Sequence, residues 1–384
     1  MPDRDNRVAR IEGFELCCTL PELAGNALRV FNQRCALLVK VTTAGGVVGW
    51  GETWAFPASA SSFIRTTLAP SILGADITNP RAAQARLLQF AIPDRRGQAH
   101  MAASALDIAF WDGYGHVEGK PIHALLGGQL RDSVLAYASG PLLKSGADRY
   151  AGFADEVERY AEAGYRAVKI RVGVGAAQDV ASIRKARAIL GEEMLLMADL
   201  NESSTPRDAV ALTEAVTDER LAWIEEPLPH DDLPGYTRLA RALAVPLAGG
   251  ESFCGVQAFR DSLCAGALDI IQPDLALCGG LTEAMRIAGL ADAFDVPVAP
   301  HVWGTGINAL AALQFASVLP SRRGSVPFPL LECDMGFNPL RTAIFEPKPD
   351  AEGRLAVPDG PGLGAEVDID LLAEYVTAHW ALES

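Results

Sequence analysis

Apolar residues in the middle of the chain gather in short continuous runs, and a stretch with helical periodicity, such as 180–190, lies between most neighbouring runs. Continuous apolar runs are typical of strands buried on both faces, and their alternation with amphipathic helices predicts a parallel sheet covered by helices. Eight such strands within about 200 residues favour a closed barrel over an open doubly wound sheet. No GxGxxG motif follows the first run, which argues against a dinucleotide-binding fold. The runs are 135–138, 167–170, 194–198, 221–224, 245–248, 268–271, 296–299 and 328–331.

The residues before the first run follow a different pattern. Residues 36–41 are rich in β-formers, 42–46 predict a turn, and 47–52 return as the second arm of a hairpin. Residues 102–112 carry apolar side chains on nearly every face, which predicts a buried helix. We therefore expect a small α+β domain ahead of the barrel. The turn-rich residues after about 340 are expected to pack back on that domain.

The composition narrows the class of protein. Hydrophobic residues make up 49% and charged residues 21% of the 384 residues, which is enough apolar material for a large core. The formal net charge of −15 disfavours nucleic acids and anionic membranes as partners. No apolar run reaches the roughly 20 residues of a membrane-spanning helix, and the charged N-terminus is not followed by an apolar signal core. We expect a cytoplasmic protein.

The cysteines agree with that expectation. They are odd in number, scattered, and form no CxxC motif, which predicts neither a disulfide framework nor a thiolate zinc site. They lie at Cys17, Cys18, Cys35, Cys254, Cys264, Cys278 and Cys333.

Polar residues follow the predicted strands at the positions where a parallel barrel carries its catalytic groups. The carboxyl ends of all strands in such a barrel meet at one mouth. Successive positions are 23 to 31 residues apart, about one strand-and-helix unit, so we expect them to converge. They are Lys169 with Arg171, Asp199 with Asn201, Glu225 with Glu226, Glu251, Asp274, His301 and Glu332.

Asp199, Glu225 and Glu251 follow three consecutive strands. Three converging carboxylates repel one another unless a cation lies between them, and oxygen ligands favour Mg²⁺, with Mn²⁺ as a possible substitute. The alternative is that each acid caps the following helix or pairs with a surface base. Glu225 and Glu226 are adjacent, so one of them points into the barrel, and we take Glu225 as the ligand. Asn201 either holds a metal-bound water or substrate oxygen, or forms a turn.

His301 and Asp274 end neighbouring strands and are expected to lie within hydrogen-bonding distance. An aspartate on one ring nitrogen fixes the tautomer of an imidazole and raises the basicity of the other nitrogen. His301 is therefore our candidate general base near neutral pH, with Asp274 as its partner. The alternative is a histidine with an ordinary polar role.

Lys169 and Arg171 lie on one face of their strand because strand side chains alternate. Facing a bound anion, they would stabilise negative charge, and a Lys169 with a lowered pKa could act as a base. Arg171 is a better carboxylate clamp than a base. Alternatively, both cations only balance the acids of the mouth. Glu332 could hydrogen-bond an oxyanion if it is protonated, or it forms a plain salt bridge.

Taken in order, these motifs resemble the enolase superfamily, in its mandelate racemase and muconate lactonising branch, over almost the full chain. The resemblance implies an α/β fold, with a modified TIM barrel, (β/α)₇β, at 128–340. It also implies an α+β capping domain at 1–127, completed by the tail at 341–384, and a homo-oligomer. Its marks are Lys169-Ile170-Arg171, Asp199-Leu200-Asn201, Glu225-Glu226-Pro227, Gly250-Glu251-Ser252, Pro273-Asp274 and Pro300-His301, then Glu332.

The resemblance also implies a reaction. Mg²⁺ on Asp199, Glu225 and Glu251 would bind a small carboxylate substrate, and His301 would remove its α-proton to give an enediolate. The motifs 301–306 and 359–364 are most similar to those of sugar-lactone cycloisomerases and acid-sugar dehydratases. Arg171 stands where the family often has a second lysine base, which weakens the alternative of a two-base racemase or epimerase. A carboxylate-binding barrel without turnover is the non-enzymatic alternative.

Substrate specificity is expected from the capping-domain segments 20–31 and 53–62. Asn26 and Arg29 in the first segment are candidate contacts to a distal carboxylate or hydroxyl groups, or are ordinary surface residues. Trp303, two residues after His301, is a further candidate substrate contact.

Overall fold

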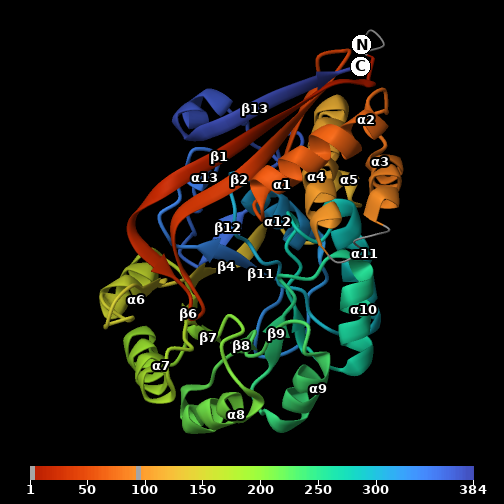
Figure 1. Cartoon of the computed structure of the whole chain (residues 1–384). Coiled ribbons are helices and arrows are strands. Elements are labelled where there is room, and N and C mark those ends of the chain that lie inside the picture. The colour runs from red at the N-terminus through yellow and green to blue at the C-terminus, as the bar shows by residue number, and fades with distance from the viewer. Residues whose placement is uncertain (1–4, 92–96) are drawn as a thin grey trace.

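The computed structural model describes residues 5–91 and 97–384, and it consists of an antiparallel sheet with its helices above a ring of parallel strands and helices (Figure 1). This is the α/β architecture that the sequence predicts. None of the helices in the described residues is long and apolar enough to cross a bilayer.

The upper sheet has the strand order β13-β1-β2-β3. Its strands are β1 (Val8–Gly25), β2 (Val30–Thr43), β3 (Val48–Thr53) and β13 (Val376–Glu383), all antiparallel to their neighbours. The expected hairpin is thus formed by β2 and β3, and the tail of the chain completes the sheet through β13, as predicted.

Helices cover one face of this sheet. The longest, α4 (Gln98–Glu118), contains the predicted buried helix and packs directly on β3. Gly49 and Gly51 permit this close approach, because a Cβ atom on either would collide with the backbone of α4. The other elements are α1 (Pro57–Phe63), the π-helical turn Ile64–Leu68, α2 (Ala69–Ile72), α3 (Pro80–Leu87), the 3₁₀ turn Leu88–Ala91 and α5 (Ile122–Leu125).

The lower sheet is parallel and follows the order β10-β9-β8-β7-β6-β4-β11. Its seven parallel strands overlap seven of the eight predicted apolar runs. The strands are β4 (Ser133–Ser139), β6 (Ala167–Arg171), β7 (Leu195–Asp199), β8 (Ile224–Glu225), β9 (Leu247–Gly249), β10 (Ile270–Ile271) and β11 (Leu330–Asp334).

The eighth run, 296–299, is not a regular strand. It joins the sheet only through parallel bridges from Val298 to Ile271 and from His301 to Asp274. Pro297 and Pro300 explain the interruption, since a proline has no N–H to donate to the ladder. The segment nevertheless occupies the position between β10 and β11 and brings His301 beside Asp274.

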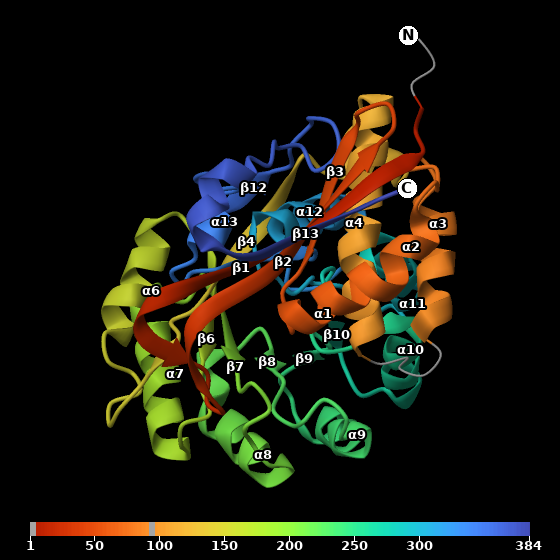
Figure 2. The ribbon, with the colours of Figure 1, turned by 45° about the horizontal axis from the view of Figure 1, so that its top comes forward.

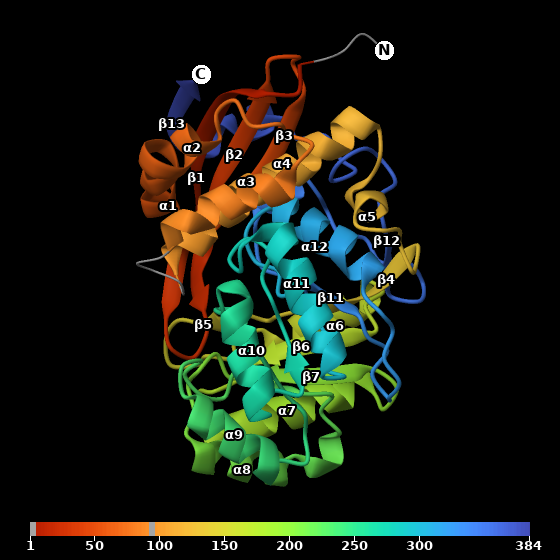
Figure 3. The same cartoon turned by 90° about the vertical axis from the view of Figure 1, so that its right-hand side faces the viewer.

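One helix follows each of the first seven strand positions, as in a (β/α)₇β barrel, and these helices surround the strands (Figures 1 and 3). They are α6 (Phe153–Glu162), α7 (Ala176–Leu190), α8 (Pro206–Ala215), α9 (Leu233–Ala242), α10 (Gly255–Ala265), α11 (Gly280–Ala293) and α12 (Gly306–Val318). Shorter elements are β5 (Leu143–Lys144), the 3₁₀ turns Thr217–Glu219 and Ile369–Tyr375, α13 (Pro339–Thr342) and β12 (Arg354–Ala356).

The long β1–β2 hairpin reaches from the upper sheet down to the barrel (Figure 2). Its tip pairs with β5, with Ala24 opposite Lys144 and Gly25 opposite Leu143. The segment 20–31 is therefore mostly strand rather than an open loop. The capping domain in this way covers the end of the barrel where the strands β6 and β7 terminate.

The hairpin contains a feature that the sequence analysis excluded. Cys17 and Cys35 form a disulfide between directly paired positions of β1 and β2, with their Cα atoms 4.0 Å apart. The expectation of no disulfide was wrong for this pair, because only the register of the hairpin shows that the two residues face each other. The other five cysteines form no disulfide in the structure.

Candidate active site

The carboxyl ends of neighbouring barrel strands place the predicted polar residues side by side. Arg171 at the end of β6 pairs in register with Asp199 at the end of β7, which pairs with Glu225 at the end of β8. Glu251 lies two residues after the end of β9, and Glu332 lies within β11. Residues 161 positions apart in sequence therefore share one mouth, which faces the capping domain (Figure 2).

Lys169 lies at the centre of this group and is 1% exposed. Its Nζ contacts Glu225 directly and lies 2.9 Å from Oε1 of Glu332 and 3.7 Å from Oδ2 of Asp199. Burial alone would lower the pKa of Lys169, but the surrounding carboxylates outweigh it and raise that pKa well above its usual value. With these acids around it, Lys169 is a cation. A lowered pKa was expected of a lysine beside bound Mg²⁺, and it stays a prediction.

The three candidate metal ligands are acids with incomplete charge compensation, of which Asp199 and Glu225 are buried and Glu251 is partly buried. Burial raises the pKa of Asp199, Glu225 and Glu251, although neighbouring cations oppose the shift. Glu225 is further held by Trp223 Nε1, at 2.9 Å, and by Gln272 Nε2, at 2.7 Å, which both donate to its Oε2. Carboxylate donors on adjacent strands have the chemistry that suits Mg²⁺.

The side chains do not form a ready-made coordination shell. Within residues 5–91 and 97–384, no three Asp, Glu, His or Cys side chains lie close enough together to hold a metal ion. The Lys169 ammonium lies among the acids instead. Asn201 lies at the edge of this group. It donates from its backbone N–H and its Nδ2 to Asp199, at 2.8 and 3.1 Å, while its buried Oδ1 has no hydrogen-bond partner among the described residues. The chemistry of this donor set, carboxylates with an amide oxygen, nevertheless suits a hard cation.

Glu226 points away from this group. Its Oε1 accepts a hydrogen bond from the Gly250 N–H at 3.3 Å, and its side chain lines a small cavity together with His230, Tyr236 and Phe253. Burial raises the pKa of Glu226 well above its usual value, because it disfavours the ionised carboxylate. Of the two adjacent acids, Glu225 is therefore the one that faces Lys169.

His301 and Asp274 form a close pair on the other side of the mouth. His301 Nδ1 lies 2.8 Å from Asp274 Oδ2, and its Nε2 lies 3.3 Å from Oε2 of Glu251. Burial lowers the pKa of His301, but Glu251, Glu332 and the hydrogen bond to Asp274 together raise it to about 10. Asp274 is completely buried. While Glu251 carries an uncompensated charge, the ring therefore favours its protonated form, and its Nε2 points into the carboxylate group.

Glu332 lies between the base and the lysine. Its Oε2 accepts a hydrogen bond from the Val302 N–H at 3.1 Å and lies 3.9 Å from His301 Nε2. Burial raises the pKa of Glu332, but Lys169 and His301 outweigh it and lower that pKa to about 2. Of the two interpretations of Glu332, the salt bridge is the one formed in this structure, with Lys169 as its partner.

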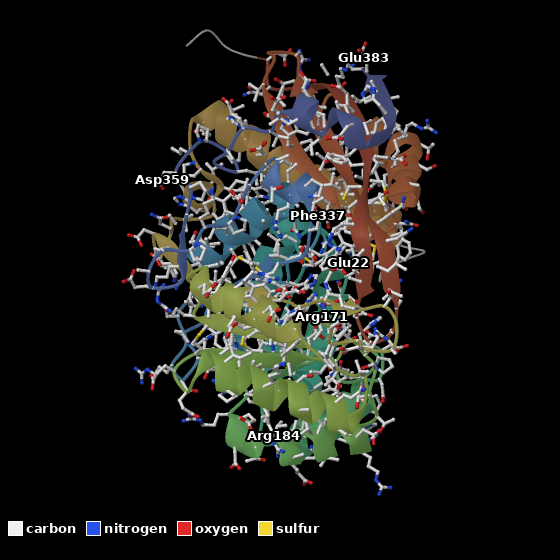
Figure 4. The ribbon with its side chains drawn as sticks, turned by 90° about the vertical axis from the view of Figure 1, so that its left-hand side faces the viewer. Glu22, Arg171, Arg184, Phe337, Asp359 and Glu383 are labelled. Atoms are coloured by element: carbon white, nitrogen blue, oxygen red, sulfur yellow. A yellow bond between two sulfur atoms is a disulfide. The ribbon has the colours of Figure 1, made fainter. Side chains whose placement is uncertain are left out.

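Arg171 is also a fixed cation. Its Nη1 donates to Ser139 Oγ at 3.3 Å, and its guanidinium lies 5.8 Å from the centre of the Trp303 ring. Burial lowers the pKa of Arg171, but Asp199, Glu332 and further acids raise it above its usual value. The residue lies at the level where the barrel helices meet the capping domain (Figure 4).

The candidate specificity residues have different surroundings. Asn26 Oδ1 accepts hydrogen bonds from the N–H groups of Leu28 and Arg29, at 3.1 and 3.0 Å, and so builds the hairpin turn. Arg29 is exposed. It lies near Glu202 at the mouth, and its positive charge helps to lower the pKa of Glu202. Trp303 lies deeper, where its ring contacts residues of the capping domain.

Two capping-domain residues at this mouth were missed by the sequence analysis. Arg34 on β2 stacks 3.9 Å from the centre of the Trp303 ring and forms a 2.8 Å ion pair with Asp334. Trp54 donates from Nε1 to Asp274 Oδ2 at 2.9 Å. These contacts join residues 300 and 220 positions apart, and no local pattern in the sequence signals them.

Comparisons with known proteins agree with this geometry. Residues 152–371 match the family model "Enolase C-terminal domain-like", and residues 25–127 match "Mandelate racemase / muconate lactonizing enzyme, N-terminal domain". The chain is 38% identical over 354 residues to D-galactarolactone cycloisomerase of Agrobacterium fabrum, covering 90% of this chain and 92% of that protein.

Two further relatives extend the range of chemistry. Arabinonate dehydratase of Saccharolobus solfataricus is 30% identical over 341 residues, covering 88% of this chain and 89% of that protein. A racemase from Streptomyces coelicolor A3(2), solved with bound magnesium, superposes with a TM-score of 0.86 at 26% identity over 96% of this chain and 100% of that one. The chain belongs to the mandelate racemase and muconate lactonizing enzyme branch of the enolase superfamily.

Proposed function

We propose that this enolase-superfamily enzyme removes the α-proton of a sugar acid or its lactone and then eliminates a β-substituent from the resulting enediolate. One observation carries the proposal: an imidazole base and a fixed ammonium flank the same buried carboxylate. Glu332 lies 2.9 Å from Lys169 Nζ through Oε1 and 3.9 Å from His301 Nε2 through Oε2. A substrate bound between the two groups can lose a proton to one and have its new negative charge stabilised by the other.

In the proposed reaction a cation bound at Glu251 would offset the charge that raises the His301 pKa, so that a neutral His301 accepts the α-proton at Nε2. The hydrogen bond from its Nδ1 to Asp274 keeps the ring in one orientation. Lys169 stays protonated and stabilises the charge that develops on the substrate carboxylate. Arg171, also a permanent cation, would hold a substrate oxygen.

We further propose that Asp199, Glu225 and Glu251 hold Mg²⁺, for which Mn²⁺ could substitute, and that Asn201 binds a water or substrate oxygen beside it. When bound, the cation would draw electron density from the substrate carboxylate and so make the α-proton more acidic. The raised pKa values of the three acids support the assignment, since a cation would compensate their charge.

The second step breaks the bond from the β-carbon to its oxygen substituent, as the electron pair of the former C–H bond forms a double bond between the α- and β-carbons. If the leaving group is hydroxide, it takes up one proton and leaves as water, which is dehydration. If it is the carboxylate of a lactone, the ring opens in a cycloisomerisation. One base suffices for both outcomes, and the similarity to a lactone cycloisomerase and a sugar-acid dehydratase supports both.

A racemase or epimerase is the alternative, in line with the similarity to the Streptomyces racemase. It requires a proton acceptor on each face of the substrate. Lys169 and Arg171 are the candidates for the second acceptor, but Arg171 stays protonated and stands where the family often has a second lysine base. This argues for elimination, and the base-and-ammonium arrangement argues against a barrel that only binds carboxylates.

The test is a panel of aldonates, aldarates and their lactones, assayed with Mg²⁺ and with EDTA. We expect a 2-keto-3-deoxy acid or a ring-opened isomer from at least one compound, and no product with EDTA. Recovery of the C2 epimer without elimination would favour the racemase. Tight binding of a sugar acid without any conversion would favour the binding-only alternative.

A further inference from the structure

We propose that Trp54 of the capping domain is a positioning residue for the His301–Asp274 pair. This inference rests on the proposed function, in which that pair supplies the base. Trp54 follows β3 and is half-buried, and its Nε1 donates to Asp274 Oδ2 at 2.9 Å. The same oxygen is 2.8 Å from His301 Nδ1, so the indole and the imidazole share one acceptor atom.

Asp274 has no freedom left in this arrangement. Its Oδ1 accepts from the Ala276 N–H at 2.8 Å and from Asn308 Nδ2 at 3.0 Å, while Oδ2 accepts from Trp54 and His301. Four donors fix the plane of the carboxylate. Three of the donors belong to the barrel, and Trp54 is the one that the capping domain contributes.

A second contact from the same strand supports the arrangement. Glu52, two residues before Trp54, accepts hydrogen bonds from the N–H groups of Thr305 and Asn308, at 2.9 Å each, at the start of α12. Asn308 in turn donates to Asp274. A closed chain of contacts therefore runs from Glu52 through Asn308 and Asp274 to Trp54 and back along β3.

The indole ring is well placed to act through orientation. Its centre lies 6.2 Å from that of the His301 ring and 6.5 Å from that of Trp303. Without the indole N–H, Asp274 Oδ2 would keep one donor and the carboxylate could rotate, which would loosen the imidazole. Partners that orient an active-site histidine typically change activity by about 10- to 100-fold when they are removed.

We would compare Trp54→Phe with a variant that carries 3-benzothienylalanine at position 54, which keeps the shape of indole and removes only the N–H. The control is Trp50→Phe, the same substitution on the same strand in the capping-domain core, since Trp50 contacts neither His301 nor Asp274 in the structure. The first readout is the ¹⁵N shifts of the His301 ring in the full-length, Mg²⁺-loaded protein, assigned with His301→Asn. The second is kcat and KM on a substrate found in the panel above.

We expect both Trp54 variants to shift the His301 ring resonances and to lower kcat by about tenfold, with KM changed by less than about threefold, while Trp50→Phe leaves both readouts unchanged. Wild-type resonances and kcat in the benzothienylalanine variant would overturn the inference. If the wild type converts no sugar acid but the resonances still shift in both Trp54 variants, the positioning role stands and the proposed function fails.

Discussion

Lys169 Nζ and Glu332 Oε1 lie 2.9 Å apart, joining β6 to β11 through the interior of the barrel. Neither residue is more than 2% exposed. The lysine also contacts Glu225 and lies 3.7 Å from Asp199, so one ammonium compensates acids from three strands. Stability and proposed chemistry thus depend on the same cation.

Replacing Lys169 with methionine should lower the free energy of unfolding by about 3–5 kcal/mol, because it leaves buried acids without their partner. Mg²⁺ should restore part of that loss, since a cation among the acids would compensate their charge. Urea unfolding with and without Mg²⁺ measures both effects. Lys185→Met on exposed α7 is the control, and equal losses in the two variants would contradict the role given to Lys169.

The adjacent acids Glu225 and Glu226 should differ in Mg²⁺ binding. Glu225→Gln should weaken Mg²⁺ affinity by about 100-fold or more, because it removes a proposed ligand and its charge. Glu226→Gln should leave the affinity within about threefold, because this side chain contacts the Gly250 N–H and lines the small cavity beside His230 instead of contacting Lys169. Isothermal titration calorimetry makes the comparison, and the reverse order would move the metal site to the other acid.

The junction between α4 and α11 should make stability depend on pH. Asp107 accepts hydrogen bonds from the N–H and the Oγ1 of Thr282, and burial raises its pKa from 3.8 to about 7. The native state therefore retains a proton that the unfolded chain loses. The proton retained on Asp107 therefore stabilises the native state by up to about 4 kcal/mol. This stabilisation is complete below about pH 4 and is lost as the pH rises to about 7.

Asp107→Asn removes this titration. As the pH rises from 4 to 7, the wild type should therefore lose unfolding free energy relative to the variant, and above pH 7 the difference between the two proteins should stay constant. Thermal unfolding in matched buffers measures it. Parallel curves for the two proteins would show that Asp107 does not titrate in this range.

Arg34 should contribute to the attachment of the capping domain. Arg34→Met leaves Asp334 with Arg341 as its remaining cation, at 3.4 Å, and removes the stacking on Trp303. We expect a loss of about 3 kcal/mol in unfolding free energy. Arg10→Met, which breaks the more exposed pairs with Glu12 and Glu383, should cost less than about 1 kcal/mol. Similar losses of unfolding free energy in Arg34→Met and Arg10→Met would show that the Arg34–Asp334 pair stabilises the protein no more than an exposed ion pair does.

Periodicity explains how much of the fold was predictable. Seven strands and the buried part of α4 appear where apolar runs predict them, because a buried strand or helix requires continuous apolar residues. The segment 296–299 was the exception, since Pro297 and Pro300 interrupt its ladder without changing its apolar character. The tail joined the capping sheet through β13, as predicted.

Site residues at strand ends were predictable because the barrel topology brings those ends together. Trp54 and Arg34 were not, since they reach the mouth from another domain and their own sequence surroundings are ordinary. The Cys17–Cys35 pairing required the register of β1 and β2. The pKa directions of Lys169 and Glu332 required the positions of all neighbouring charges, which no spacing provides.

The most direct test of the central claim follows the α-proton itself. A sugar acid or lactone is incubated with enzyme and Mg²⁺ in D₂O, and proton NMR records the loss of the α-hydrogen signal and the formation of product. We predict that the wild type consumes the α-hydrogen and that His301→Asn, folded and still binding Mg²⁺, slows this by about 1,000-fold or more. Undiminished α-hydrogen loss in His301→Asn would contradict the assignment of His301 as the base.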